Sequence, residues 1–287
     1  MSAMGLYSEH RNHPWVKHLR NALIALLLTF LAALALFPIF YMITSSFGPA
    51  IATAGNMRSI FPSSWSLDSY RAFFNFNVYA KRWILNSFII SLSTVIGNVI
   101  FASMAGYAFA KLDFPLKKPL FFIILTQLML PGQVFIIPQY LMLSSMNQLN
   151  TRFALIFPGL VSAFGTFFLR QFYMSLPNQL MEASVLDGCS VGQTFLLIMM
   201  PLTRTAMMAL AVFTALFAYS DMMWPLIVNM NIDKMTLSAG ISSLQGQHST
   251  EYPIMMAGSA LAMIPMLVLY LLFQKQFIAG IATGSGK

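Results

Sequence analysis

The stretch Glu182-Ala183-Ser184-Val185-Leu186-Asp187-Gly188 is a polar island in an otherwise apolar chain, because it holds two of the eight acidic residues. Around it, hydrophobic residues make up 58% of 287 positions and charged residues only 8%, with a mean hydropathy of +0.72. Soluble domains are roughly a quarter charged, so a chain this apolar does not cover a water-facing surface. The composition predicts a polytopic membrane protein.

The apolar residues gather into segments long enough to cross a bilayer, which needs about 20 residues in helix. Backbone groups inside lipid must be satisfied internally, and no alternation typical of a membrane barrel appears, so we expect an all-α fold. The first segment follows basic residues and is too long for the core of a signal peptide, which favours an uncleaved transmembrane helix. The six expected transmembrane helices are 22–43, 83–110, 119–143, 153–169, 205–228 and 254–273.

Lys and Arg predict the orientation, since they concentrate on the cytoplasmic side of membrane segments. With the N-terminus inside, ten of the 16 Lys and Arg residues lie inside and six outside. Both termini and the island are then cytoplasmic. The same rule accounts for the net charge of +8, and no basic run with interleaved aromatics suggests a nucleic-acid partner. Cys189 is the only cysteine, so no disulfide within the chain is possible.

The island itself predicts two short helices separated by a sharp turn. Pro177 suits the first turn of a helix, Gly188 suits the left-handed residue that ends one, and Ser190 with Gln193 fits a capping box that starts the next. We expect this second helix to span 191–200 and to stop at Pro201. The apolar stripe of the first helix is expected to consist of Leu176, Leu180, Ala183 and Leu186.

Glu182 and Asp187 fall off that stripe, so the hairpin presents carboxylates. The alternative is an amphipathic hairpin lying in the membrane interface, but such helices usually carry Lys and Arg on their polar face. No Lys or Arg lies between Arg170 and Arg204. The pattern therefore favours a docking surface for another protein.

At these residues the chain resembles a known family: the island is similar to the EAA signature of bacterial ABC importer permeases, E-A-A-x-x-D-G with Ile-x-x-Pro-Leu downstream. Ser184 replaces the usual second Ala, and Cys189 stands where Ala is usual. The resemblance extends over 83–280 and points to the carbohydrate-uptake subfamily, closest to the shorter, six-helix permease of maltose-type transporters. It also rests on the segments 85–87, 105–110, 129–131, 168–172, 176–177 and 224–226.

The resemblance implies a type I importer permease of the MetI-like fold in the bacterial cytoplasmic membrane. It implies three kinds of partner: a second homologous permease, two ATPase subunits and an extracytoplasmic solute-binding protein. The cargo would be a sugar or oligosaccharide, with glycerol-phosphate or another polar solute as the alternative. The permease would work by alternating access. Its coupling helix, seated in an ATPase cleft, would use Glu182, Ala183, Ser184, Asp187 and Gly188.

Three parts of the chain are expected on this basis. They are an N-terminal part (1–82) with the first transmembrane helix and an outer loop, a permease core (83–280) that includes the coupling loop 170–204, and a cytoplasmic tail (281–287). The chain contains no G-x-x-x-x-G-K-[ST] motif, so ATP and Mg²⁺ would bind to separate ATPase subunits. We expect no catalytic residue, metal site or cofactor in the chain itself.

Competing classes have less support. An intramembrane enzyme needs paired catalytic groups, and a non-ABC channel needs a charged pore ring. Asp221 is the only acidic residue deep in an apolar segment. Such residues are functional candidates by default: Asp221 is either an acceptor for ligand hydroxyls or a structural carboxylate bonded to a neighbouring helix or to Ser220.

The other pathway candidates are polar or aromatic side chains in the apolar segments. Trp224 is favoured as an anchor at the membrane interface. The outer loop 229–253 is either a contact for the binding protein or a solvated connector. The pathway set is completed by Tyr219, Gln127 and Asn86, and the loop candidates are Gly240, Gln245, Gly246 and His248.

Overall fold

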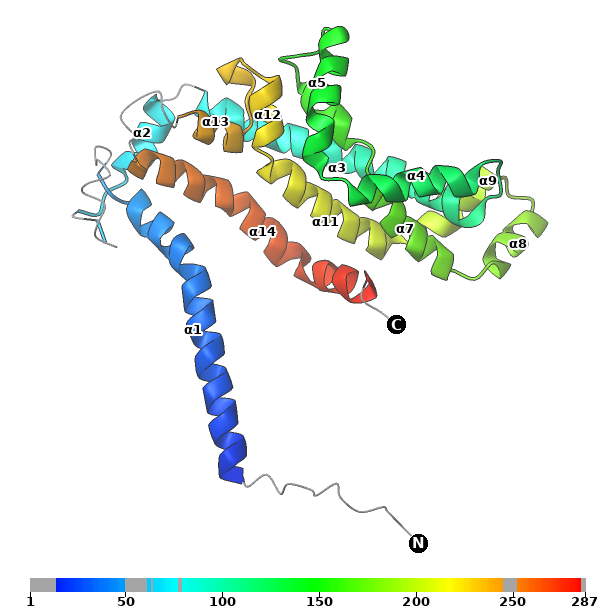
Figure 1. The fold of residues 1–287 in the computed structure, drawn as a ribbon, viewed down its shortest axis with the longest axis horizontal. Helices are drawn as coiled ribbons and strands as arrows, with labels where there is room; N and C mark the ends of the chain where they lie inside the picture. Colours follow the sequence, from blue (N-terminus) through cyan, green and yellow to red (C-terminus); the bar gives the residue numbers. More distant parts are fainter. Residues whose placement is uncertain (1–13, 50–60, 63, 77–78, 245–251, 285–287) are drawn as a thin grey trace.

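The computed structural model describes residues 14–49, 61–62, 64–76, 79–244 and 252–284, and all regular structure in these ranges is helical. One helix diverges from an elongated bundle formed by the others (Figure 1). The elements are α1 (Pro14–Ser46), α2 (Asp68–Phe76), α3 (Ala80–Lys111), α4 (Lys117–Met129), η2 (Gly132–Phe135), α5 (Ile136–Ser145), α6 (Arg152–Ile156), η3 (Phe157–Gly159), α7 (Ala163–Ser175), α8 (Gln179–Leu186), α9 (Val191–Gln193), η4 (Thr194–Met199), α10 (Met200–Leu202), α11 (Arg204–Ser220), α12 (Met223–Val228), η5 (Ile232–Lys234), α13 (Leu237–Ser243) and α14 (Tyr252–Gly284).

Four stretches of this helical structure are long and apolar enough to cross a membrane, or up to six if each of two bent pairs counts as one span. The expected helix 119–143 is wrong as a single element, because α4 and the segment from η2 to α5 meet at 109°. Pro131 explains the break: it has no N–H to donate, and it restricts the residue before it. Leu130 is accordingly extended (φ −92°, ψ 136°).

The expected helix 205–228 is also broken. It ends at Ser220, resumes as α12 after the extended residue Asp221 (φ −62°, ψ 123°), and meets the preceding segment 191–202 at an angle of 76°. Hydropathy located these segments because both halves of each bend are apolar. The bends themselves depend on single residues.

Helix α1 lies apart from the bundle along most of its length and touches α14 near its C-terminal end (Figure 1). Most side chains from Lys17 to Phe40 are exposed within the chain. The C-terminal end is fixed by Ser46, whose Oγ lies 2.8 Å from the Tyr70 hydroxyl of α2. A helix with so much exposed apolar surface needs lipid or another protein around it.

The centre of the bundle is α3, which packs against α7 and α11. Glycine permits the closest approach: a Cβ at Gly106 would lie 2.9 Å from the Arg170 backbone N and 3.1 Å from Leu169 Cβ. Arg170 binds α7 to two neighbours, since its Nε donates to Phe109 O (3.2 Å) and its guanidinium lies over the Phe121 ring. Helices α3, α7 and α11, here called the frame, are therefore closely packed on one another.

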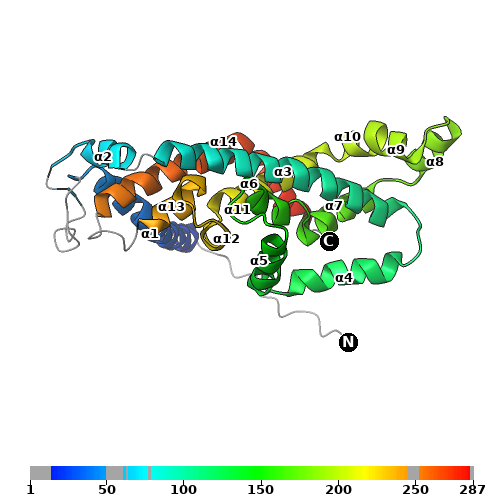
Figure 2. The same ribbon diagram turned by 90° about the horizontal axis from the view of Figure 1, so that it is seen from above.

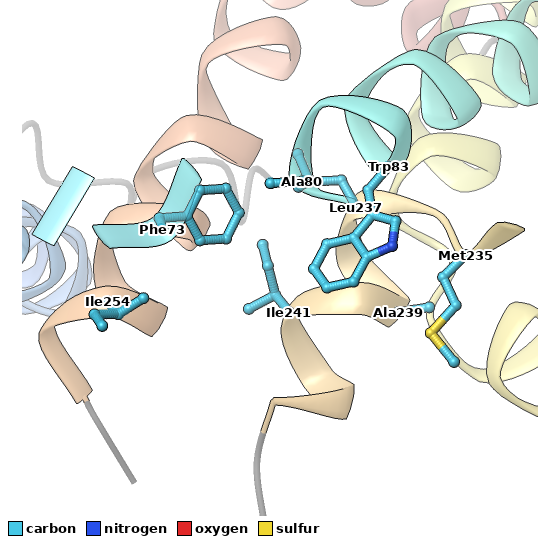
Figure 3. Packing of buried hydrophobic residues seen from close by; sticks show 8 residues of the cluster. All are labelled: Phe73, Ala80, Trp83, Met235, Leu237, Ala239, Ile241 and Ile254. Carbon is cyan, nitrogen blue, oxygen red and sulfur yellow. The ribbon is translucent and has the colours of Figure 1, made fainter. Parts of the chain in front are cut away.

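Two buried clusters lie toward opposite ends of this frame. In one, the Trp83 indole covers α13, so that a Cβ at Gly240 would overlap the ring (Figure 3). That cluster comprises Phe73, Ala80, Trp83, Met235, Leu237, Ala239, Ile241 and Ile254. The other comprises Ala102, Tyr107, Leu169, Tyr173, Phe195, Met199, Ala206 and Leu210, and it supports the base of α8 and η4.

Candidate functional site: the α8–α10 hairpin

Residues 179–202 form a helical hairpin, here called the α8–α10 hairpin, at one end of the molecule (Figures 1 and 2). The expected turn is confirmed, because Gly188 has a φ of +82°. The capping box is also confirmed: Ser190 Oγ accepts from Gln193 N, and Gln193 Oε1 accepts from Ser190 N at 2.8 Å. The island therefore folds as two capped helices joined at a glycine.

The expected stop at Pro201 is wrong. The second helix continues through Pro201 to Leu202, and η4, which precedes the proline, is a π-helix. A proline ring collides with the carbonyl of residue i−4 in a regular α-helix, and the wider π turns accommodate it. The helix ends at Thr203, whose Oγ1 donates to the carbonyls of Met199 and Met200.

The buried face of α8 also differs from the expected stripe. Leu180 and Met181 pack on the cluster around Tyr173 and Phe195, and Ser184 is 2% exposed. Ala183 and Leu186, expected in the stripe, are exposed instead. Relative to the expected stripe, the buried face of α8 is shifted around the helix axis to include Ser184, because the side chain of Ser184 has a polar partner in the segment below α8.

That partner is Thr194 of η4. Ser184 Oγ donates to Met181 O (2.7 Å) and lies 2.9 Å from Thr194 Oγ1, and both hydroxyls are buried. Ser184 is thus more than a small replacement for alanine. Its hydroxyl closes the two arms of the hairpin on each other.

Lys111, the last residue of α3, holds the start of the hairpin. Its Nζ donates to Leu176 O (2.6 Å) and to Asn178 Oδ1 (2.7 Å), both in the link between α7 and α8. From the sequence, Lys111 is only one of the inside cations. Its position as the last residue of a long apolar helix is the feature that could have indicated that it binds a neighbouring segment.

The outward face of the hairpin is apolar at its tip and acidic beside it. Leu186 is 87% exposed and Val185 65%. Glu182 and Asp187 are exposed, and within the described residues neither carboxylate takes part in a salt bridge or a hydrogen bond to another side chain. An exposed leucine flanked by unpaired carboxylates is chemically suited to a partner cleft that is apolar inside and basic at its rim.

The pathway candidates have different surroundings in the structure. Asp221 lies in the break between α11 and α12, where its Oδ1 accepts from Trp224 N (3.3 Å) and caps α12. Ser220 Oγ bonds to the backbone of α11 rather than to Asp221. Trp224 is half-buried, and its indole N–H donates to Ala154 O (3.0 Å), which docks α12 on α6.

Tyr219 and Gln127 have opposite surroundings. Tyr219 is 5% exposed and its hydroxyl has no hydrogen-bond partner in the described part of the chain, whereas Gln127 is exposed on α4. Asn86 is buried and borders an open cleft of about 570 Å³ near the end of the molecule away from the hairpin.

The outer-loop candidates are only partly described. Gly240 lies in the helix α13, buried beneath Trp83, rather than exposed in an outer loop. A residue without a side chain is needed there to admit the indole. Gln245, Gly246 and His248 lie outside the described residues. Among the residues that are described, no three His, Cys, Asp or Glu side chains gather as metal ligands.

Comparison with known proteins places these features in context. A family model described as a binding-protein-dependent transport system inner membrane component matches residues 98–282. An arabinooligosaccharide transport system permease protein of Halalkalibacterium halodurans is 34% identical over 260 residues, which cover 90% of this chain and 93% of the relative. Its counterpart in Bacillus subtilis is 33% identical over 279 residues, covering 96% and 99%.

Two further similarities concern a different solute and a solved structure. An sn-glycerol-3-phosphate transport system permease protein of Shigella flexneri is 29% identical over 277 residues, covering 94% of this chain and 97% of the relative. A chain in the crystal structure of a bacterial ABC transporter involved in the import of the acidic polysaccharide alginate has a TM-score of 0.77 and 20% identity, covering 91% of this chain and 97% of that one. This last similarity concerns the fold alone.

Proposed function

This chain belongs to the family of binding-protein-dependent transport system inner membrane components, and we propose that it is the permease subunit of an ATP-driven importer for a sugar or oligosaccharide. In this assignment it spans the bacterial inner membrane several times and is a transport subunit rather than an enzyme. The permease would pair with a second, homologous permease. Two ATPase subunits would bind ATP and Mg²⁺, and an extracytoplasmic binding protein would deliver the solute.

The observation that carries the coupling role is the exposed tip of the α8–α10 hairpin. Leu186, 87% exposed, lies with the exposed Val185 beside the carboxylates of Glu182 and Asp187, and burial of this apolar surface against a partner would be favourable. Seating the apolar tip in an ATPase cleft would remove its surface from water, and basic groups of that cleft would pair with Glu182. The sites of ATP hydrolysis and solute passage lie on different chains, so this contact is the route between them.

A movement of the α8–α10 hairpin would reach the bundle at both ends of the hairpin, through the link to α7 and through the bend before α11. A displacement of α8 acts on α3 through Lys111, which holds the link to α8 by two hydrogen bonds. It acts on η4 through the Ser184–Thr194 contact and on α11 through the bend at Thr203. Because α3 and α11 pack on each other, the hairpin and the bundle would move as one rigid body during alternating access.

The cargo is assigned from the relatives and from charge. The two arabinooligosaccharide permease proteins are similar over nearly the whole chain. In α11 and α12 the charged residues are Arg204 at the start and Asp221 in the break, and a carboxylate there disfavours an anionic solute. We therefore place a neutral saccharide ahead of glycerol phosphate.

Reconstitution tests this assignment. The chain, its partner permease, the ATPase and the binding protein would be assembled in proteoliposomes, and ATP-dependent uptake of labelled arabinooligosaccharides would be compared with that of sn-glycerol 3-phosphate. Saccharide uptake is expected, and Glu182→Lys should abolish it. Asp68→Lys, a charge reversal on exposed α2, is the matched control and should retain uptake. Absence of ATP-dependent uptake in the wild-type importer would refute the proposal.

A further inference from the structure

An open cleft of about 570 Å³ lies at the N-terminal end of α3, formed by three segments that are distant in sequence. Arg82, Leu85 and Asn86 come from the first turns of α3, Thr151 and Arg152 from the start of α6, and Asp233 and Lys234 from η5. Along α3, Arg82 is about 44 Å from Lys111 at 1.5 Å per residue. Because this length exceeds the roughly 30 Å of a bilayer's hydrocarbon core, the expected topology puts the cleft and the α8–α10 hairpin on opposite sides of the membrane.

Positive charge is in excess in this cleft. Arg82, Arg152 and Lys234 face a single carboxylate, Asp233, and the ion pair within the cleft joins Arg82 Nη1 to Asp233 Oδ2 at 3.9 Å. These are three of the six cations that the expected topology places outside, where Lys and Arg are normally sparse. Half of the Lys and Arg residues that are expected on the outer side thus lie at one site.

The guanidinium of Arg152 is held in place by a neutral group. Asn86 is 2% exposed, and its Oδ1 accepts from Arg152 Nε (3.2 Å) and Nη2 (2.9 Å). The Asn86 Nδ2 donates to the carbonyls of Asp233 and Met235, both at 3.1 Å. All the hydrogen-bonding capacity of the amide is used to fix α6 and η5 against α3, so Asn86 is a positioning residue rather than part of a solute pathway.

This arrangement orients Arg152 and Lys234 without neutralising them, whereas Arg82 is paired with Asp233. Among the described residues no carboxylate lies within 4.0 Å of Arg152 or Lys234. The Lys234 Nζ donates to a neutral carbonyl, Asn150 O (2.8 Å). An arginine fixed by neutral groups and open to a cleft is prepared for a carboxylate, with which guanidinium forms its strongest hydrogen bonds.

We propose that this cleft receives carboxylate side chains of the extracytoplasmic binding protein when it docks. The inference rests on the proposed function. Two features favour a protein over a phospholipid headgroup. Asp233 lies among the cations, which suits a surface of mixed charge, and Leu85 adds an exposed apolar contact at the same rim. Charges at an interface rim set the association rate and specificity of docking.

The test is the concentration of binding protein that gives half-maximal stimulation of ATP hydrolysis by the importer in nanodiscs. Arg82→Gln should raise this concentration roughly two- to fivefold, the range of a solvent-exposed ion pair. Asp233→Asn removes the one carboxylate of the cleft and should lower it. Lys81→Gln removes a neighbouring exposed cation that does not line the cleft and should leave it unchanged.

The opposite signs expected for Arg82 and Asp233 separate this inference from simple misfolding, which would weaken docking in both variants. Unchanged values in both, or shifts in the same direction, would overturn it. An effect seen only in nanodiscs that contain anionic phospholipid would assign the cleft to a headgroup and would overturn it as well. If the wild-type importer shows no stimulation by any binding protein, the proposed function has failed instead.

Discussion

Replacing Ser184 by alanine tests how the α8–α10 hairpin is held together. Ser184 Oγ donates to Met181 O, so in the 2.9 Å contact with Thr194 Oγ1 it is the threonine hydroxyl that donates. Both residues are 2% exposed, and Ser184→Ala would leave the Thr194 hydroxyl buried without its acceptor. The substitution is small in volume, so its effect reports on the hydrogen bond.

The expected magnitude follows from two opposing contributions. A buried hydroxyl without a partner costs about 1–3 kcal/mol, whereas alanine improves the helix propensity of α8 by about 0.5 kcal/mol. The net loss of about 0.5–2.5 kcal/mol corresponds to a roughly 2- to 70-fold increase in the local opening equilibrium of α8, taking RT as about 0.6 kcal/mol.

Amide hydrogen exchange of the assembled importer measures this opening. Peptides covering 179–187 should exchange faster in Ser184→Ala, and the double variant Ser184→Ala/Thr194→Val should recover most of the protection, because both polar partners are then replaced by apolar groups. Exchange equal to that of the wild type, or a double variant that opens more than the single one, would show that the Ser184–Thr194 hydrogen bond does not hold α8 closed.

Three further predictions concern other parts of the frame. Lys111→Met should release the link between α7 and α8 and reduce solute uptake per ATP hydrolysed, while Lys111→Arg should restore the ratio; an unchanged ratio in Lys111→Met would contradict the role of this residue in transmission. Gly106→Ala should destabilise the importer by about 1–3 kcal/mol through overpacking of α3 on α7, seen as a lower melting temperature, whereas Gly132→Ala, where a Cβ meets nothing within 4 Å, should not. Asp221→Asn should retain the cap of α12 and uptake within about twofold, while Asp221→Ala should cost about 1 kcal/mol of stability; loss of uptake in Asp221→Asn would favour ligand contact instead.

The sequence predicted the helical class, the positions of the apolar segments and the turn of the hairpin. Each depends on local chemistry. A glycine at position 188 adopts a φ of +82° without strain, and Ser190 and Gln193 each bond the other's backbone N–H within one helical turn. Hydropathy holds no information on the direction of a helix axis, so it does not predict the bend at Pro131 within the segment 119–143.

The face that α8 buries depends on contacts across the fold. Periodicity placed Leu186 in the core, but the cluster below α8 offers a buried hydroxyl, Thr194, to Ser184, and this outweighs the apolar stripe. The same limit applies to Lys111 and Asn86, whose partners lie 65 and 66 residues away in sequence. Their roles are visible only after the chain has folded.

Photocrosslinking from position 186 tests whether the tip of the hairpin contacts the ATPase. A photoreactive residue would replace Leu186 in the assembled importer, with Phe30 of α1, 63% exposed, as the matched position away from the hairpin. We expect an adduct with the ATPase subunit from position 186 and none from position 30. Adducts from position 186 that exclude the ATPase would contradict this contact.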